Sequence, residues 1–277
     1  MNDAVQTAVV AAPSPPGSFG PRWAELVRRF EAGGWRTVLV PDTLRTPSPF
    51  PALAAAAAVT STLRVRTWVA AAPFRTPGAL VREAAALQAL SDGRFELGIG
   101  PGRPEAEAET ARLGTVWGRA ADRISQVVAA VAAVRDQVRP VPPVAVAAGG
   151  NVMLAAAVDI TPEPDDRIAL AVGPLATVDD LSQAANRVHD LAGRRVRLSH
   201  QVTGIGEAVP AWLRHNGLNA ATMRAHGAAG WFPSDDPAGT AEALVERAST
   251  LGIDEVVVPA ELTQPFAPVL ERLAAGQ

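Results

Sequence analysis

The sequence of 277 residues contains no cysteine and no tyrosine, and only four histidines. The absence of cysteine excludes disulfides, thiolate metal sites, iron–sulfur clusters and a cysteine nucleophile. A metal site built from three histidines would use nearly all of the histidines in the chain. We therefore expect no metal centre.

The chain also lacks an excess of charge and a long apolar run. The 25 Lys and Arg residues nearly balance the 28 Asp and Glu residues, and no basic run is present, which argues against a nucleic-acid partner. The best candidate for a membrane span, 50–59, is far shorter than the ~20 residues that a span needs. The first four residues carry no positive charge, so we expect no signal peptide and a cytoplasmic location.

Short apolar runs alternate with amphipathic segments along the whole chain, which predicts parallel strands connected by helices. About eight such units fit the ~250-residue size of a (β/α)₈ TIM barrel, and an open doubly wound sheet is the alternative. With no internal repeat or Gly/Ser linker, we expect one domain over 1–277. The predicted strands are 4–12, 37–40, 63–72, 95–99, 141–148, 167–172, 195–202 and 254–259, with 159–161 as a further candidate. The predicted helices are 18–33, 49–61, 77–90, 119–138, 152–158, 177–191, 208–215, 218–226, 237–251 and 264–275.

Two glycine clusters follow predicted strands. The first, Gly98-x-Gly100-x-Gly102, lacks the dinucleotide-binding spacing, so either a flat group approaches the backbone there or the loop needs positive φ. The second, Gly149-Gly150-Asn151, stands between a strand and a helix. Such a position suits either a phosphate cradle or a tight turn.

Few side chains qualify as acids, bases or anion clamps. Asp42 ends the second strand, where its carboxylate either binds a cofactor ring or caps the next segment. Arg75 and Arg103 follow the third and fourth strands and either clamp an anion or are solvated. His200 lies on the seventh strand. It either points into the barrel and takes part in function or, like most single histidines, is structural. Glu105, Glu107 and Glu109 alternate in a predicted loop, and we interpret them as solvated.

No Ser-His-Asp order, HExxH motif, Walker loop or EF-hand spacing is present. A barrel with so few acid–base candidates suits an enzyme whose chemistry resides in a bound cofactor.

Several blocks of the sequence resemble the bacterial luciferase-like superfamily. The most specific runs from Arg82-Glu83-Ala84 through Leu90-Ser91-Asp92-Gly93-Arg94-Phe95-Glu96-Leu97-Gly98 and is similar to the signature of flavin- and deazaflavin-dependent members. Segments 34–42 and 62–66 share the resemblance. Segments 251–258 and 266–270 resemble the end of an actinobacterial branch called coenzyme F-420-dependent.

The resemblance implies a (β/α)₈ barrel that binds coenzyme F-420 or FMN at its C-terminal mouth. It implies catalytic positions at Asp42 and at Thr43, where relatives often carry histidine. From their positions at the strands, and not from the resemblance, we expect substrate contacts from Arg75, Arg103 and His200. A non-proline cis peptide behind the ring is expected within 68–71. The implied cofactor-binding residues are Trp68, Val69, Ala70, Ala71, Gly100, Gly102, Gly149, Gly150 and Asn151.

We therefore expect an oxidoreductase that uses reduced deazaflavin or flavin for hydride transfer to, or monooxygenation of, a small organic substrate. The alternative is a barrel that has lost catalysis and acts as a binding or subunit-partner protein. Relatives commonly dimerise, and the apolar segment 52–59 offers one face for a homodimer.

Overall fold

The computed structural model describes residues 5–12 and 19–276. The loop expected at 13–16 and the first residue of the predicted strand 4–12 lie outside this range. Strands alternate with helices along the chain, and the fold is the expected (β/α)₈ barrel. By internal contacts the chain divides into two compact units, 10–167 and 1–9 with 168–277, which are described separately. The single domain over 1–277 stays a prediction.

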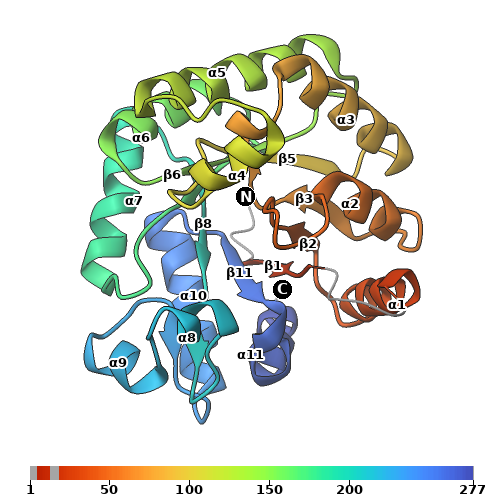
Figure 1. The fold of residues 1–277 in the computed structure, drawn as a ribbon. Helices are drawn as coiled ribbons and strands as arrows, with labels where there is room; N and C mark the ends of the chain where they lie inside the picture. Colours follow the sequence, from red (N-terminus) through yellow and green to blue (C-terminus); the bar gives the residue numbers. More distant parts are fainter. Residues whose placement is uncertain (1–4, 13–18, 277) are drawn as a thin grey trace. The chain divides into compact units, whose positions relative to one another are not determined.

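The first unit, 10–167, contains a row of parallel strands in the order β2, β3, β5, β6, with β4 continuing β3 along β5. Its helices α2, α3 and α5 pack side by side on the outside of these strands (Figure 1). The strands are β2 (Thr37–Val40), β3 (Arg64–Thr67), β4 (Ala70–Ala71), β5 (Phe95–Gly100) and β6 (Val144–Ala148). The helices are α1 (Phe19–Ala32), α2 (Pro49–Ala57), η1 (Ala72–Phe74), α3 (Pro77–Leu90), α4 (Ala106–Leu113), α5 (Ala120–Gln137) and α6 (Asn151–Ile160).

The second unit contains the remaining elements, and its strands β8 and β11 are parallel neighbours. Helix α10 packs against α11 and α7. Two strands, β1 (Gln6–Val10) and β7 (Arg167–Leu170), each have one end residue that is counted in the first unit. The other strands are β8 (Arg197–Gln201), β9 (Gly204–Ile205), β10 (Trp231–Phe232) and β11 (Glu255–Pro259). The helices are α7 (Val178–Ala192), α8 (Ala211–His215), α9 (Ala220–Ala225), α10 (Pro237–Leu251), η2 (Ala260–Leu262) and α11 (Thr263–Ala275).

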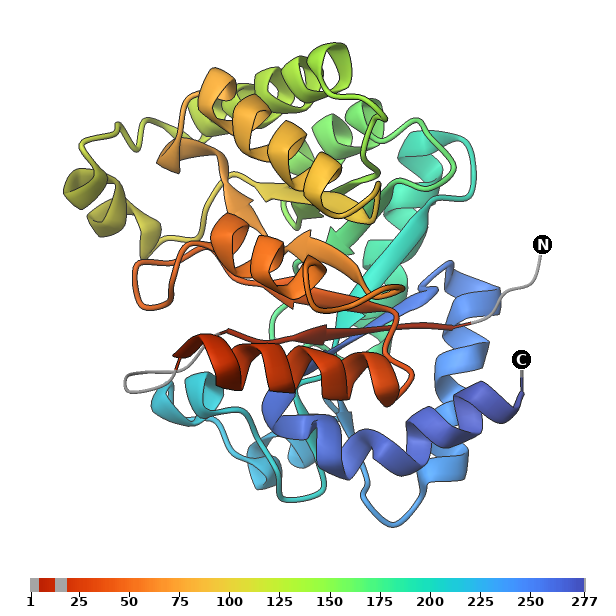
Figure 2. The same ribbon diagram turned by 90° about the vertical axis from the view of Figure 1, so that its right-hand side faces the viewer.

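The structure departs from the predicted elements most clearly at three places in the first unit. The predicted strand 63–72 is broken into β3 and β4 by a cis peptide between Trp68 and Val69, which lies in the expected region. The strand candidate 159–161 is wrong, because α6 continues to Ile160. Residues 106–113, predicted as loop, form α4. Figure 2 shows this helix, in olive, beyond the carboxyl end of β5.

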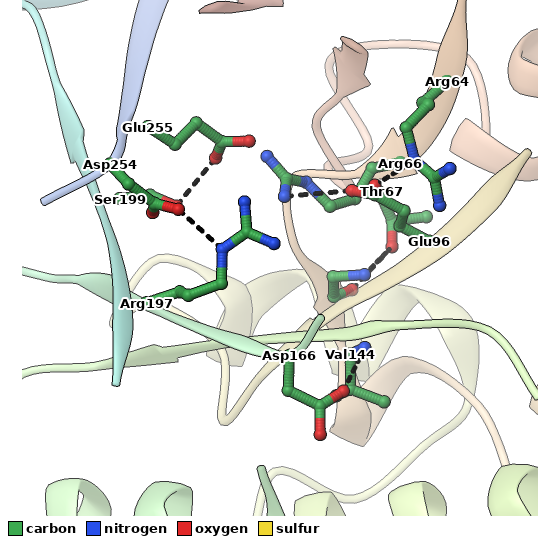
Figure 3. A network of polar contacts seen from close by, with 11 residues as sticks. Arg64, Arg66, Thr67, Glu96, Val144, Asp166, Arg197, Ser199, Asp254 and Glu255 are labelled. Carbon is green, nitrogen blue, oxygen red and sulfur yellow. Dashed lines mark hydrogen bonds and ion pairs between the residues drawn. The ribbon is translucent and has the colours of Figure 1, made fainter. Parts of the chain in front are cut away.

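Most of the signature block acts in packing the first unit. Arg94 donates to the carbonyl oxygen of Ala57 at the end of α2 (2.9 Å) and to that of Leu63 just before β3 (2.8 Å). Glu96 forms ion pairs with Arg64 and with the fully buried Arg66 (3.1 Å to the latter), as Figure 3 shows. Arg94 and Glu96 thus have their partners inside the fold.

Helix α2 offers little free apolar surface for a dimer. Most of its apolar residues are buried and the helix packs against β3 and α3 of the same unit, while Pro51 and Ala55 are exposed. The homodimer therefore stays a prediction without an assigned surface. Among the residues that the structure describes, no helix is long and apolar enough to cross a membrane.

One carboxylate links α1 to the loop before β3. Glu31 Oε1 accepts hydrogen bonds from the backbone N–H groups of Ser61 (2.8 Å), Thr62 (2.6 Å) and Leu63 (3.0 Å), and from the Thr62 hydroxyl (3.0 Å). Burial by itself raises the pKa of this carboxyl, but the hydrogen bonds outweigh it and lower the pKa from 4.5 to about 2. The charged form is therefore favoured by folding.

We predict that Glu31→Gln lowers the free energy of unfolding at pH 7 by about 1 kcal/mol, a value kept small because the carboxylate is close to solvent. Since the folded-state pKa is depressed, this stabilisation is full above about pH 4.5 and is lost as pH falls toward 2. Urea unfolding of wild type and variant from pH 7 to 3 measures the difference. Glu25→Gln, on the exposed side of the same helix, is the control. A gap between wild type and Glu31→Gln that does not shrink at low pH would contradict the assignment.

Candidate functional site

Asp42 lies just after β2 and is buried, with 7% of its surface exposed. Its Oδ2 atom accepts two hydrogen bonds, from the Ala71 backbone N–H (3.0 Å) and from Arg75 Nη1 (2.7 Å). Within the described residues, no hydrogen bond reaches its Oδ1 atom. The carboxylate thus connects the end of β2 to β4 through one oxygen, rather than capping the segment that follows it.

Arg75 is held by two carboxylates. Besides Asp42, its Nε atom lies 3.3 Å from Glu83 Oε2 on α3, and its guanidinium carbon lies 5.3 Å from the centre of the Phe50 ring. Burial raises the pKa of Glu83; the Arg75 charge lowers it, and the Asp42 charge raises it further. The structure therefore brings Arg75 to Asp42, and its substrate contact stays a prediction.

Thr43 belongs to a second polar cluster, formed with Arg103 and Glu109. The Thr43 hydroxyl donates to Glu109 Oε1 (3.0 Å) and accepts from Arg103 Nη2 (3.0 Å). Arg103 also pairs with Glu109 at 2.5 Å and donates to the Asp42 carbonyl oxygen at 3.3 Å. The cluster joins the loops after β2 and β5, and it leaves the Thr43 hydroxyl with partners inside the protein.

Glu109 is the residue of this cluster that the sequence interpretation missed. We expected it to be solvated in a loop, but it lies on α4 with 7% of its surface exposed. Ala106 and Thr110, one helical turn apart, are buried on the same helix. This spacing was the available signal, and the alternation of Glu105, Glu107 and Glu109 obscured it.

Of the expected cofactor residues, 68–71 and the glycines of β5 meet within the first unit. A Cβ atom at Gly100 would lie 2.9 Å from Val69 Cγ2, so the Val69 side chain occupies the space beside this glycine. Gly102 has φ +84°, and a Cβ atom there would lie 2.8 Å from the Trp117 ring. The flat group that approaches Gly102 is therefore a side chain of the protein itself.

Gly149, Gly150 and Asn151 stand exposed at the end of β6, where α6 begins at Asn151. No side chain caps this helix, and its first N–H groups have no acceptor within the helix. A Cβ atom at Gly150 would meet nothing within 4 Å. Unlike Gly100 and Gly102, Gly150 keeps open space beside it.

His200 lies on β8 in the other unit. The neighbouring Ser199 donates to Glu255 Oε2 (2.7 Å), and strand alternation puts His200 on the opposite face of β8. Figure 3 shows the Ser199–Glu255 contact. Burial, and then the charge of Arg247 on α10, lowers the pKa of His200 to about 3, so the imidazole is neutral at physiological pH. Its role in substrate binding stays a prediction.

A pocket of about 350 Å³ lies beside β4 in the first unit. It borders Ala71 and Arg75, which both contact Asp42, and it is otherwise mainly apolar. Its lining comes from residues 70–73, 75–77, 80, 99, 114–116, 126 and 130. Its volume is at the lower end of the range of small-molecule sites.

Comparison with solved structures shows the same fold over nearly the whole chain. A coenzyme F-420-dependent tetrahydromethanopterin reductase from Methanopyrus kandleri matches with a TM-score of 0.67 at 16% identity, covering 96% of each chain. The oxygenating constituent of 3,6-diketocamphane monooxygenase from Pseudomonas putida, solved with FMN, matches with a TM-score of 0.69 at 15% identity, covering 97% of this chain and 96% of that one. An F-420-dependent secondary alcohol dehydrogenase has a TM-score of 0.70 at 14% identity and covers 99% of both chains.

No curated protein matches the chain in sequence. The sequence model of the luciferase-like monooxygenase family, in contrast, matches residues 9–203, which is more than half of the chain and includes Asp42, β4, β5 and the start of α6. The protein therefore belongs to the luciferase-like monooxygenase family.

Proposed function

We propose that this protein is an oxidoreductase that binds coenzyme F-420 or FMN and acts on a small organic substrate. The family and the activities named for the similar structures, two F-420-dependent enzymes and one FMN-binding monooxygenase, support this proposal. The observation that carries it is Asp42, a buried carboxylate at the end of β2 that is fixed through one oxygen. Its second oxygen has no partner among the described residues.

The residues fit such a cofactor in two places. Asp42 Oδ1 is an acceptor for a ring N–H or ring hydroxyl, and the start of α6 offers N–H groups to a phosphate, which both cofactors carry. Gly100 and Gly102 fit less well, because Val69 and Trp117 fill the space beside them. We therefore assign cofactor contacts to Asp42 and to 149–151, and a supporting role to the two glycines.

The bound cofactor would supply the hydride, or with flavin and oxygen the oxygenating chemistry. The protein orients the ring and excludes water. Asp42 accepts a hydrogen bond from the ring edge, and Arg75 and the Ala71 N–H hold that carboxylate in place. The Thr43 hydroxyl donates a hydrogen bond to Glu109, and its catalytic role stays a prediction. We assign proton handling at this site to Asp42.

The direct test of the function is a titration of the purified protein with F-420 and with FMN, followed by cofactor absorbance and fluorescence. Saturable binding of one cofactor supports the oxidoreductase and identifies the cofactor. Binding of neither would favour the alternative of a barrel that has lost catalysis and serves as a binding or subunit-partner protein.

We predict that Gly150→Val weakens binding of the cofactor by roughly tenfold, because its side chain enters the space that the phosphate needs beside the first turn of α6. The variant keeps the fold, since φ is −77° at this position and no atom lies within 4 Å of a Cβ. The dissociation constant and the melting temperature are measured together. Gly173→Val, at another glycine with open space, is the control. Unchanged affinity in Gly150→Val would remove this site from the assignment.

We predict that Asp42→Asn keeps the fold and lowers turnover more than it weakens binding, by roughly 10²–10⁴-fold, the range of general acid–base effects. Its amide oxygen can still accept the Ala71 N–H, but it no longer carries the charge that pairs with Arg75. Asp42→Ala loses both contacts, so its affinity falls as well. Cofactor affinity and melting temperature are measured on both variants, and turnover once a substrate is found. Lower melting temperatures with unchanged cofactor affinity would make Asp42 structural only.

A further inference from the structure

Glu83, the acidic residue of α3, forms an ion pair with Arg75, and Arg75 forms a second ion pair with Asp42. The Glu83 Oε2 atom is buried and lies 3.3 Å from Arg75 Nε, while Arg75 Nη1 lies 2.7 Å from Asp42 Oδ2. The guanidinium thus stands between two carboxylates and uses a different nitrogen for each. The planar group cannot turn to improve one contact without changing the other.

The face of the same guanidinium is also constrained. The Phe50 ring of α2 lies 5.3 Å from its central carbon, and the Arg75 side chain is 13% exposed. Glu83, Asp42 and Phe50 therefore fix the group at two edges and one face. Removing Glu83 frees Arg75 to rotate about its side-chain torsions, which moves the donor away from Asp42.

The ion pair between Glu83 and Arg75 contributes little to stability. The Glu83 side chain is 39% exposed, and its shielded Oε2 atom makes no hydrogen bond. A partly exposed ion pair of this kind is screened by water and gains little free energy. The position of Glu83 is better explained by the orientation that it imposes on Arg75.

We propose that Glu83 is a positioning residue: it holds Arg75, which fixes Asp42 Oδ2 against the Ala71 N–H and leaves Oδ1 for the cofactor ring. The last part of this inference rests on the proposed function, and the first part does not. Loss of Glu83 then disturbs Asp42 without removing any group that touches the cofactor.

The first experiment needs no cofactor. Hydrogen exchange of the Ala71 amide, followed by NMR, reports on its bond to Asp42. In Glu83→Leu we expect this exchange to accelerate by roughly tenfold, and to accelerate also in Glu83→Gln, which keeps the shape of the side chain but loses the charge that pairs with Arg75. Arg82→Gln, which removes an exposed charge from the same helix, is the control and leaves the rate unchanged. Equal exchange in wild type and Glu83→Leu would overturn the proposal.

The second experiment adds F-420 or FMN. We expect Glu83→Leu to bind the cofactor about tenfold more weakly and to move the absorption maximum of the bound ring in the same direction as Asp42→Asn does. If Asp42→Asn changes affinity and spectrum but Glu83→Leu changes neither, the positioning role is refuted. If the wild type binds neither cofactor, the proposed function fails, and the Ala71 exchange rate alone decides whether Glu83 positions Asp42.

Discussion

The candidate site depends on one carboxylate oxygen, Asp42 Oδ2, which accepts from the Ala71 N–H and from Arg75. β4 is two residues long, and its Ala71 amide donates outside the β4–β5 ladder. The same contact ties the loop after β2 to the start of α3, because Arg75 lies between β4 and that helix. Hydrogen bonds to an ionised acceptor are among the stronger ones in proteins, so this junction is defined by charge as much as by packing.

The most recognisable stretch of the sequence proves to be mainly structural. Arg94 donates to carbonyl groups at the end of α2 and just before β3, and Glu96 pairs with Arg66 inside the first unit. Gly98 cannot be replaced, because a Cβ atom there would lie 1.8 Å from the Thr67 carbonyl oxygen. Within this block, Glu83 is the residue that points toward the candidate site. A family signature therefore identifies the fold without marking the residues that contact a ligand.

Elements with strong local signals could be predicted from the sequence. Helices α3 and α10 begin at Pro77 and Pro237, as expected, and in the structure Thr76 and Asp236 cap them. Two kinds of feature could not be predicted. The break between β3 and β4 could not be predicted, because the sequence of 63–72 keeps the apolar pattern of one continuous strand. The burial of Glu109 depends on Arg103 and Thr43, which lie elsewhere in the chain.

The same limit applies to the site. The position of Asp42 at the end of a strand could be predicted from the sequence. Its partners Ala71 and Arg75, and the Glu83 that pairs with Arg75, come from segments brought together only by the fold. In the sequence Arg75 was either an anion clamp or a solvated residue, because nothing local indicated the two carboxylates that pair with it. Pairing between charges that are distant in the sequence depends on the tertiary structure, so it cannot be predicted from residue spacing.

We propose that a flavin-type cofactor binds between the loop after β2 and the start of α6. The most direct measurement is the NMR titration of isotope-labelled protein with F-420 and FMN, followed at every assigned backbone amide. With one of the two cofactors, we expect saturable changes in amide chemical shift that are concentrated at 42–43, at 70–71 and at 149–152. Shifts confined to other segments, or none with either cofactor at millimolar concentration, would contradict this proposal.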